Sequence, residues 1–184
     1  MNEHLKPVFE IVLPKITSAN IPYWVYGGLG YASMVGHFYR RNPDVDLFVL
    51  DSDFENVENI FDNLCKENSW KICKTFIRSG RRKIELCIKE KERLSVIPVC
   101  KTGNSVEFTF REGSKKYPLE ILTQVERHLG GYRFQTPQDS FLKALLIGYL
   151  ESKKNYPNRK KRIEDAKHVL RTEEFLKYFP TENT

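Results

Sequence analysis

Two adjacent glycines between two short apolar segments constrain the fold of this chain more than any other feature. The first segment, residues 23–26, is rich in aromatic and β-branched side chains and predicts a β-strand. Gly27 and Gly28 predict a turn into a short helix of small residues that ends near Gly36. The second segment, residues 45–50, has almost no polar interruption, which predicts a strand buried on both faces.

Apolar periodicity predicts further elements on both sides of this unit. Helical spacing indicates a helix over residues 5–16 with a kink at Pro14, and another helix behind the capping-box sequence at residues 52–55. Alternating patterns predict four strands, over residues 70–77, 83–88, 94–99 and 106–110. A turn at residues 79–82 joins the first two of these strands, and residues 117–125 fit either a strand or a helix.

The last quarter of the chain is predicted to be helical. Thr136 and Pro137 are typical of a helix start, with the threonine as N-cap and the proline in the first turn. A basic, polar connection over residues 152–162 precedes a further helix over residues 163–170. We therefore predict an α+β fold, with a mixed-sheet core over residues 1–133 and a helical lobe over residues 134–184 that packs on it.

The composition is typical of a soluble globular protein, with 40% hydrophobic and 29% charged residues. No apolar run is long enough to span a membrane and the N-terminus lacks the layout of a secretion signal, so we expect a cytoplasmic protein without a membrane partner. The net charge of +6 suits a nucleic acid or a nucleotide triphosphate equally well. Wide spacing of the cysteines favours reduced thiols over a zinc site or a disulfide framework: Cys65, Cys73, Cys87 and Cys100.

Two carboxylates one residue apart open the second apolar segment. Asp44 and Asp46 would point to the same face of a strand, where both could bind a hard cation such as Mg²⁺, which prefers oxygen ligands. The preceding glycines allow backbone N–H groups to approach a phosphate, and the helix start that follows adds a favourable dipole. This order predicts a phosphate site beside a divalent-metal site, although an Asp-x-Asp pair by itself is also common at strand starts and turns.

Further charged residues could complete such a site. Glu85 lies in a strand pattern whose apolar neighbours face the other way, so it is a candidate third ligand or the base for an acceptor hydroxyl. Glu90 and Glu92 in the following charged turn are alternatives. Arg40 and Arg41 could pair with phosphate or with the two aspartates, or lie on an exposed basic loop.

Together these residues resemble the core motif of the polymerase-β-like nucleotidyltransferase superfamily. The likeness rests on Gly27-Gly28, on Gly36, on Arg40 four residues before the first acid, and on Asp44-x-Asp46. It is strongest to small two-lobe members, namely aminoglycoside and lincosamide nucleotidyltransferases and the toxin-type proteins of abortive-infection systems. Such a resemblance implies a mixed-sheet nucleotidyltransferase core with a C-terminal helical lobe.

The later chain carries looser matches to the same family. Residues 134–143 are similar to the strand, proline and lysine-bearing helix that begin its helical lobe, and residues 159–165 to its basic segment. This chain has Glu85 where the family commonly has aspartate, and Lys161-Arg162 where Lys-Asp is frequent. We expect Asp165 to pair with Arg162 three residues earlier rather than to act in catalysis.

The resemblance implies specific roles for the candidate residues. It assigns two Mg²⁺ ions to three carboxylates: Asp44, Asp46 and Glu85. It assigns the nucleotide to five further residues: Gly27, Gly28, Arg40, Arg41 and Lys143.

The expected activity is Mg²⁺-dependent transfer of NMP from an NTP, with ATP as first choice, to a small hydroxylated molecule. One alternative is transfer to RNA or protein, for which the basic stretch at residues 153–162 would suit RNA, although it also fits a solvated surface. Another alternative is a non-catalytic nucleic-acid-binding or interaction protein on a degenerate version of the fold.

Overall fold

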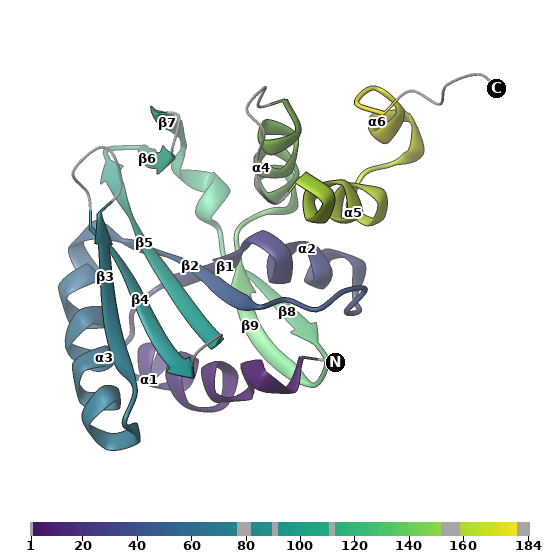
Figure 1. Ribbon diagram of the computed structural model, residues 1–184. Coiled ribbons are helices and arrows are strands. Elements are labelled where there is room, and N and C mark those ends of the chain that lie inside the picture. Colours follow the sequence, from purple (N-terminus) through teal and green to yellow (C-terminus); the bar gives the residue numbers. More distant parts are fainter. Residues whose placement is uncertain (1, 77–81, 90–91, 111–112, 152–158, 180–184) are drawn as a thin grey trace.

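A computed structural model describes residues 2–76, 82–89, 92–110, 113–151 and 159–179. Within them, a seven-stranded mixed sheet lies between two groups of helices (Figure 1). Its main path runs in the order β1-β2-β5-β4-β3, while β6 pairs with β5 and β7 with β6. The strands are β1 Tyr23–Tyr26, β2 Asp44–Leu50, β3 Lys71–Phe76, β4 Arg82–Lys89, β5 Glu92–Thr102, β6 Ser105–Phe110 and β7 Gly113–Pro118.

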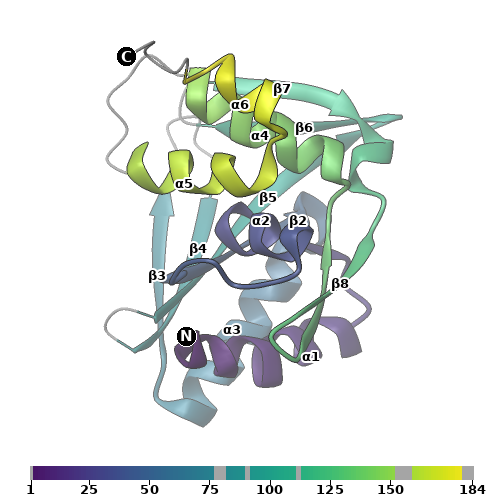
Figure 2. The same cartoon turned by 90° about the vertical axis from the view of Figure 1, so that its right-hand side faces the viewer.

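The helices divide between the two faces of this sheet. They are α1 Leu13–Ser18, α2 Gly27–Val35, α3 Phe54–Asn68, α4 Asp139–Glu151, α5 Arg159–Val169 and α6 Thr172–Leu176. In Figure 1, α1 and α3 lie on one side, and α2, α4 and α5 on the other. A separate hairpin, β8 Val125–Leu129 and β9 Tyr132–Thr136, lies against β1. The turned view in Figure 2 shows α4, α5 and α6 gathered above α2. This arrangement confirms the predicted α+β fold.

Strand β2 is buried on both faces, as its sequence predicts. Val45, Leu47 and Val49 are fully buried in the hydrophobic core that α1 and α3 form with the sheet. Phe48 projects the other way into a second core, where it lies close to Phe141 of α4. Because residues of a strand alternate between faces, β2 joins the two cores and holds its first residues at their common edge.

The first helical region is continuous but changes its winding. A π-type stretch, Val8–Val12, leads directly into α1, and Pro14 lies in the first turn of α1. A proline has no N–H and cannot donate to the carbonyl four residues earlier. The wider turns just before it therefore lose no hydrogen bond at that position.

The strand predictions agree with the structure, but three helix starts do not. All four alternating segments form strands β3 to β6, while the turn predicted at residues 79–82 lies largely outside the described residues. The predicted helix behind residues 52–55 is α3, and its stripe is buried. The capping box there is wrong, because Asp53 is the N-cap and makes no side-chain capping bond within the described structure. Residues 117–125 include the end of β7 and a 3-10 turn, Leu119–Leu122.

In the helical lobe, α4 starts later in the chain than predicted, and α5 starts earlier. Helix α4 starts at Asp139, and the Thr136 hydroxyl instead donates to the carbonyls of Val125 and Pro137, so the threonine N-cap is wrong. Helix α5 already starts at Arg159, inside the stretch predicted as a polar connection. The division after residue 133 falls within β9 and stays a prediction. None of the described helices is long and apolar enough to cross a membrane.

Candidate functional site

The two aspartates lie at the start of β2 and project from the same face of the sheet. The register pairs Asp46 with Tyr26 of β1 and with Ser95 of β5, and it pairs Ser95 in turn with Glu85 of β4. Paired residues of neighbouring strands project to the same side. Tyr26, Asp46, Ser95 and Glu85 therefore form one line across the sheet, which we call the Asp46 row. Asp44 is exposed at its edge.

Gly27 brings the start of α2 against the Asp46 carboxylate. Its φ of +67° is a conformation that side chains disfavour. A Cβ there would also lie 2.9 Å from Asp46 Oδ2. The next residue, Gly28, has equally little space, because a Cβ would overlap the side chains of Arg40 and Asn42. The two glycines are therefore required by close packing of site side chains around the N-terminus of α2.

Asp46 lies in an unfavourable environment for a carboxylate. Burial raises the pKa of Asp46 to about 7, and the neighbouring charge of Asp44 acts in the same direction. Lys83 and Arg162 oppose this shift, and Glu85 adds slightly to it. Two adjacent carboxylates, one of them half-buried, form a donor set that a divalent cation would stabilise.

Glu85 lies on the Asp46 row but not on the strand next to β2. Strand β5 lies between them and presents Ser95. The Glu85 carboxylate is held by Lys83 Nζ at 2.5 Å and by Arg93 Nη1 at 3.5 Å. Among the described residues, no three His, Cys, Asp or Glu side chains form a metal cluster. Its role as a third ligand stays a prediction.

Of the two alternative acids, Glu92 is described by the structure and does not join this row. Glu92 begins β5 and, by strand alternation, projects to the face opposite Arg93 and Ser95. Glu90 lies outside the described residues.

Arg40 forms a buried ion pair with the helical lobe. Its Nε and Nη2 donate to the two carboxylate oxygens of Asp165 at 2.7 and 3.0 Å. Asp165 is fully buried and also accepts from the Tyr39 hydroxyl at 2.9 Å and from Arg162 Nη1 at 3.3 Å. The predicted Arg162–Asp165 pair is confirmed. The two further donors were not predicted, because residues 39 and 40 are distant in sequence from residue 165.

The loop that carries Arg40 is fixed by the start of the chain. Asn42 N donates to the Asn2 side chain at 2.9 Å, and His4 Nε2 lies 2.7 Å from the Asn42 carbonyl oxygen. Asn2 is itself buried. By contrast, Arg41 in the same loop is exposed. The N-terminal residues thus hold in place the segment that leads into the two aspartates.

Arg162 is the cation of the helical lobe that acts on Asp46. Its guanidinium lies 4.6 Å from the ring centroid of Tyr149 and 5.8 Å from that of Tyr31. Charges of Asp165 and Asp46 raise its pKa, as do the two tyrosines, and outweigh the effect of burial. Sequence reasoning placed this residue in a basic surface segment. The signal that could have found it is the helical spacing of residues 162, 165, 166 and 169, which defines the inward face of α5.

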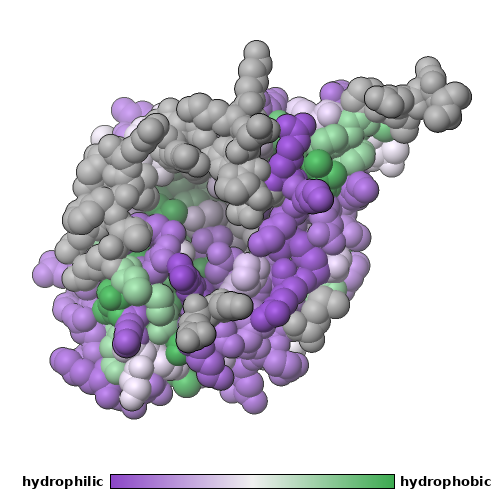
Figure 3. Space-filling model, in the orientation of Figure 1, coloured by the Kyte–Doolittle hydropathy of each residue, from purple (hydrophilic) through white to green (hydrophobic). Residues whose placement is uncertain are grey.

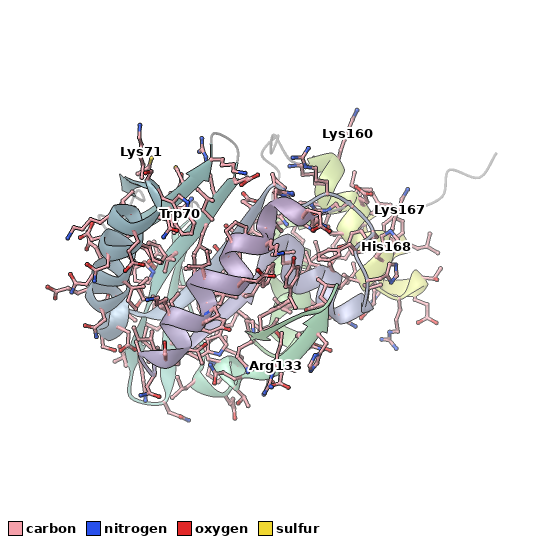
Figure 4. The ribbon with its side chains drawn as sticks, turned by 90° about the horizontal axis from the view of Figure 1, so that it is seen from below. Trp70, Lys71, Arg133, Lys160, Lys167 and His168 are labelled. Atoms are coloured by element: carbon pink, nitrogen blue, oxygen red, sulfur yellow. The ribbon has the colours of Figure 1, made fainter. Side chains whose placement is uncertain are left out.

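Lys143 faces a different neighbour. Its Nζ lies 4.0 Å from Glu174 Oε2 of α6, and the charges that act on Asp46 are those of other residues. Its assignment to the nucleotide stays a prediction. Figure 4 shows that Lys160 and Lys167 project outward from α5. His168 of the same helix stacks on Tyr39, with ring centroids 4.1 Å apart.

The chain thus combines a glycine turn into α2, the Asp-x-Asp strand β2 beside it and a helical lobe, and solved structures of nucleotidyltransferases share this fold. The lincosamide antibiotic adenylyltransferase LnuA, solved with lincomycin bound, matches with a TM-score of 0.63 over 92% of this chain and 96% of that one, at 14% identity. The antibiotic-resistance factor ANT(2'')-Ia in solution matches with a TM-score of 0.69 over 97% and 90%, at 16% identity. The crystal structure of ANT(2'')-Ia with adenylyl-2''-tobramycin gives 0.61 over 91% and 90%, at 16% identity.

These similarities confirm the resemblance at the level of the fold. No protein-family model and no curated protein sequence matches the chain. The fold is therefore shared with antibiotic nucleotidyltransferases at identities too low to carry over a substrate.

Proposed function

We propose that this protein is a nucleotidyltransferase that moves NMP from an NTP to the hydroxyl of a small molecule. The observation that carries the proposal is the placement of Asp44 and Asp46 on one face of β2, against the N-terminus of α2 at Gly27. The related folds support an adenylyl donor and a small acceptor, because one structure holds lincomycin and another holds adenylyl-2''-tobramycin. ATP is thus the first donor to test.

The aspartate pair fits Mg²⁺ in chemistry and position. Both side chains supply the oxygen ligands that Mg²⁺ prefers. Asp46 lies against Gly27 at the start of α2, and strand alternation puts Asp44 on the same face of β2. Bound there with the triphosphate, Mg²⁺ would neutralise charge on the α-phosphate and on the leaving pyrophosphate. Asp44 and Asp46 would hold the ions, of which two are expected from the fold. Glu85 is the third candidate ligand.

The chain itself supplies the remaining groups for in-line transfer. The N–H groups at the start of α2 would bind the phosphates, with Gly27 and Gly28 leaving space for their approach. Glu85, held by Lys83 and Arg93, would accept the proton of the acceptor hydroxyl. The acceptor oxygen then bonds to the α-phosphorus while the bond to the bridging oxygen breaks, and pyrophosphate leaves.

Arg162 is the group best placed to contact the triphosphate from the helical lobe. It is a half-buried cation that already interacts with Asp46, and it is held between two tyrosine rings and Asp165. A preorganised arginine binds phosphate oxygens with two parallel hydrogen bonds. We therefore assign to Arg162 the contact that sequence reasoning gave to Lys143.

Label transfer tests the proposed activity directly. The full chain is incubated with Mg²⁺ and each α-labelled NTP, and is offered lincosamides and aminoglycosides, total RNA or a protein mixture. Label in a small molecule, lost in Asp46→Asn and retained in the exposed control Asp62→Asn of α3, supports the proposal. Label only in RNA or protein supports the alternative acceptor, and no label with any NTP overturns nucleotidyl transfer.

The role of Arg162 is tested by its effect on the NTP. Losing charged hydrogen bonds worth about 1.5–3 kcal/mol should raise the KM for NTP roughly ten- to a hundredfold in Arg162→Gln, with a smaller change in kcat. The matched control is Lys160→Gln, which removes an outward-facing charge from the same helix. Equal KM values in the two variants would exclude a phosphate contact by Arg162.

A further inference from the structure

Two free thiols lie side by side on the hairpin that carries Glu85. The Sγ atoms of Cys73 on β3 and Cys87 on β4 are 3.2 Å apart. Cys73 is exposed and Cys87 is half-buried. Cys87 is also in register with Arg93 of β5, and Arg93 is in register with Asp44 of β2. The cysteine pair therefore borders the line of paired residues that contains Asp44. We propose that Cys73 and Cys87 form a reversible disulfide that shifts β4 and so controls the site.

The strand register indicates that such a bond would be strained. Cys73 is opposite Glu85 and Cys87 is opposite Lys71, so the two cysteines are diagonal neighbours. Diagonal Cα atoms in an antiparallel pair are about 7–8 Å apart, whereas a disulfide joins Cα atoms at most about 7 Å apart. The strands must therefore move relative to each other when the bond forms. Strained and exposed disulfides are easily reduced, which makes this one reversible.

The chemistry needs only a small disulfide such as oxidised glutathione. The exposed Cys73 thiolate attacks it and forms a mixed disulfide, releasing one small thiolate. The Cys87 sulfur, after losing its proton to solvent, attacks Cys73 Sγ and displaces the second thiolate. Two protein thiols are oxidised and one small disulfide is reduced to two thiols. Cys73 is exposed to a small disulfide in solution and Cys87 is half-buried, so Cys73 is the attacking and Cys87 the resolving residue.

A movement of β4 would reach the candidate site through Glu85. Glu85 is the register partner of Cys73 and lies two residues from Cys87 on the same face of β4. The pairing of β4 with β5 already shifts register between Cys87 and Lys89, so this end of the strand tolerates displacement. Oxidation should therefore move Glu85 relative to Asp46 and reduce transfer. This consequence for activity rests on the proposed function.

Thiol counting in glutathione buffers tests the disulfide independently of activity. The wild-type chain should lose two of its four free thiols as the oxidised fraction rises, and peptide mass analysis should show Cys73 linked to Cys87. Cys65→Ser and Cys100→Ser should behave like the wild type. Cys87→Ser should stop at glutathione on Cys73. Four persistent thiols, or a bond that involves Cys65, would overturn the proposal.

Activity then tests the coupling to the site. Oxidised wild-type protein should transfer label at least several-fold more slowly and recover on reduction, whereas Cys73→Ser should be insensitive to the buffer. Equal rates for the fully cross-linked and reduced forms would refute control by this pair. If no transfer is found under any condition, the thiol count still decides whether the disulfide forms, so failure of the proposed function is recognised separately.

Discussion

Asparagine in place of Asp46 keeps the shape of the side chain and removes its charge. In the folded protein this carboxylate is half-buried beside Asp44, and the pKa of Asp46 is raised to about 7 from an ordinary 3.8. A group that binds its proton more tightly in the folded state than in the unfolded state destabilises the fold once it ionises. The variant should therefore be more stable than the wild type when metal is absent and the pH is high.

The sign and size of this stability difference follow from the pKa of Asp46 in the folded state and in the unfolded state. At a pH below about 4 both states are protonated at this position and there is no penalty. As the pH rises to 7, the unfolded state releases its proton first, so the penalty grows, and it is complete above the folded pKa. One pKa unit corresponds to about 1.4 kcal/mol, which gives an upper limit of about 4 kcal/mol. Solvent screening of a half-buried side chain lowers this to about 1–3 kcal/mol.

Denaturant unfolding in EDTA measures this effect. The gain in unfolding free energy of Asp46→Asn over the wild type should be larger at about pH 8 than at about pH 5, by about 1–2 kcal/mol. Asp62→Asn, an exposed carboxylate of α3, should show no such trend. Mg²⁺ should stabilise the wild type at the higher pH and leave the variant unchanged. A variant that is less stable than the wild type at the higher pH would refute the reasoning.

Two further substitutions have matched controls within the chain. Gly27→Ala should cost more stability than Gly103→Ala, by about 1–2 kcal/mol in thermal or chemical unfolding, because both glycines have positive φ but only the first has a side chain within reach. Equal losses would mean that backbone strain alone is responsible. Arg40→Ala should lose about 1.5–3 kcal/mol because it removes two hydrogen bonds to the buried Asp165 carboxylate, which keeps Tyr39 and Arg162 as partners. The exposed Arg41→Ala should stay within about 0.5 kcal/mol. Similar unfolding midpoints for the two arginine variants would contradict a structural role for the ion pair.

Local patterns were sufficient to predict strands β1 to β6 and the glycine turn, but they did not predict β7 to β9. The run at residues 45–50 is buried on both faces because it faces two cores, and its composition carries that information. The close approach of Gly27 to Asp46 likewise follows from a turn between neighbouring antiparallel strands. These features depend on residues near one another in the chain, which is where periodicity is informative.

Strand order and the residue pairs that link the two lobes could not be predicted from such local patterns. Spacing does not reveal that β5, although later in the chain than β4, lies next to β2 and separates it from Glu85. Lys143 and Arg162 are both basic helical residues, and only packing decides which of them meets Asp46. The sequence could also not show that Arg40 is paired with a residue 125 positions away.

The buried pair between Arg40 and Asp165 also limits how the two lobes can move. Separating them would break two charge-assisted hydrogen bonds between Arg40 and Asp165, each worth about 1.5–3 kcal/mol. An opened form would then make up on the order of one molecule in a few hundred or fewer at equilibrium. For the proposed reaction we therefore expect substrates to enter along the exposed edge near Asp44 and Arg93 rather than through wide opening between the lobes.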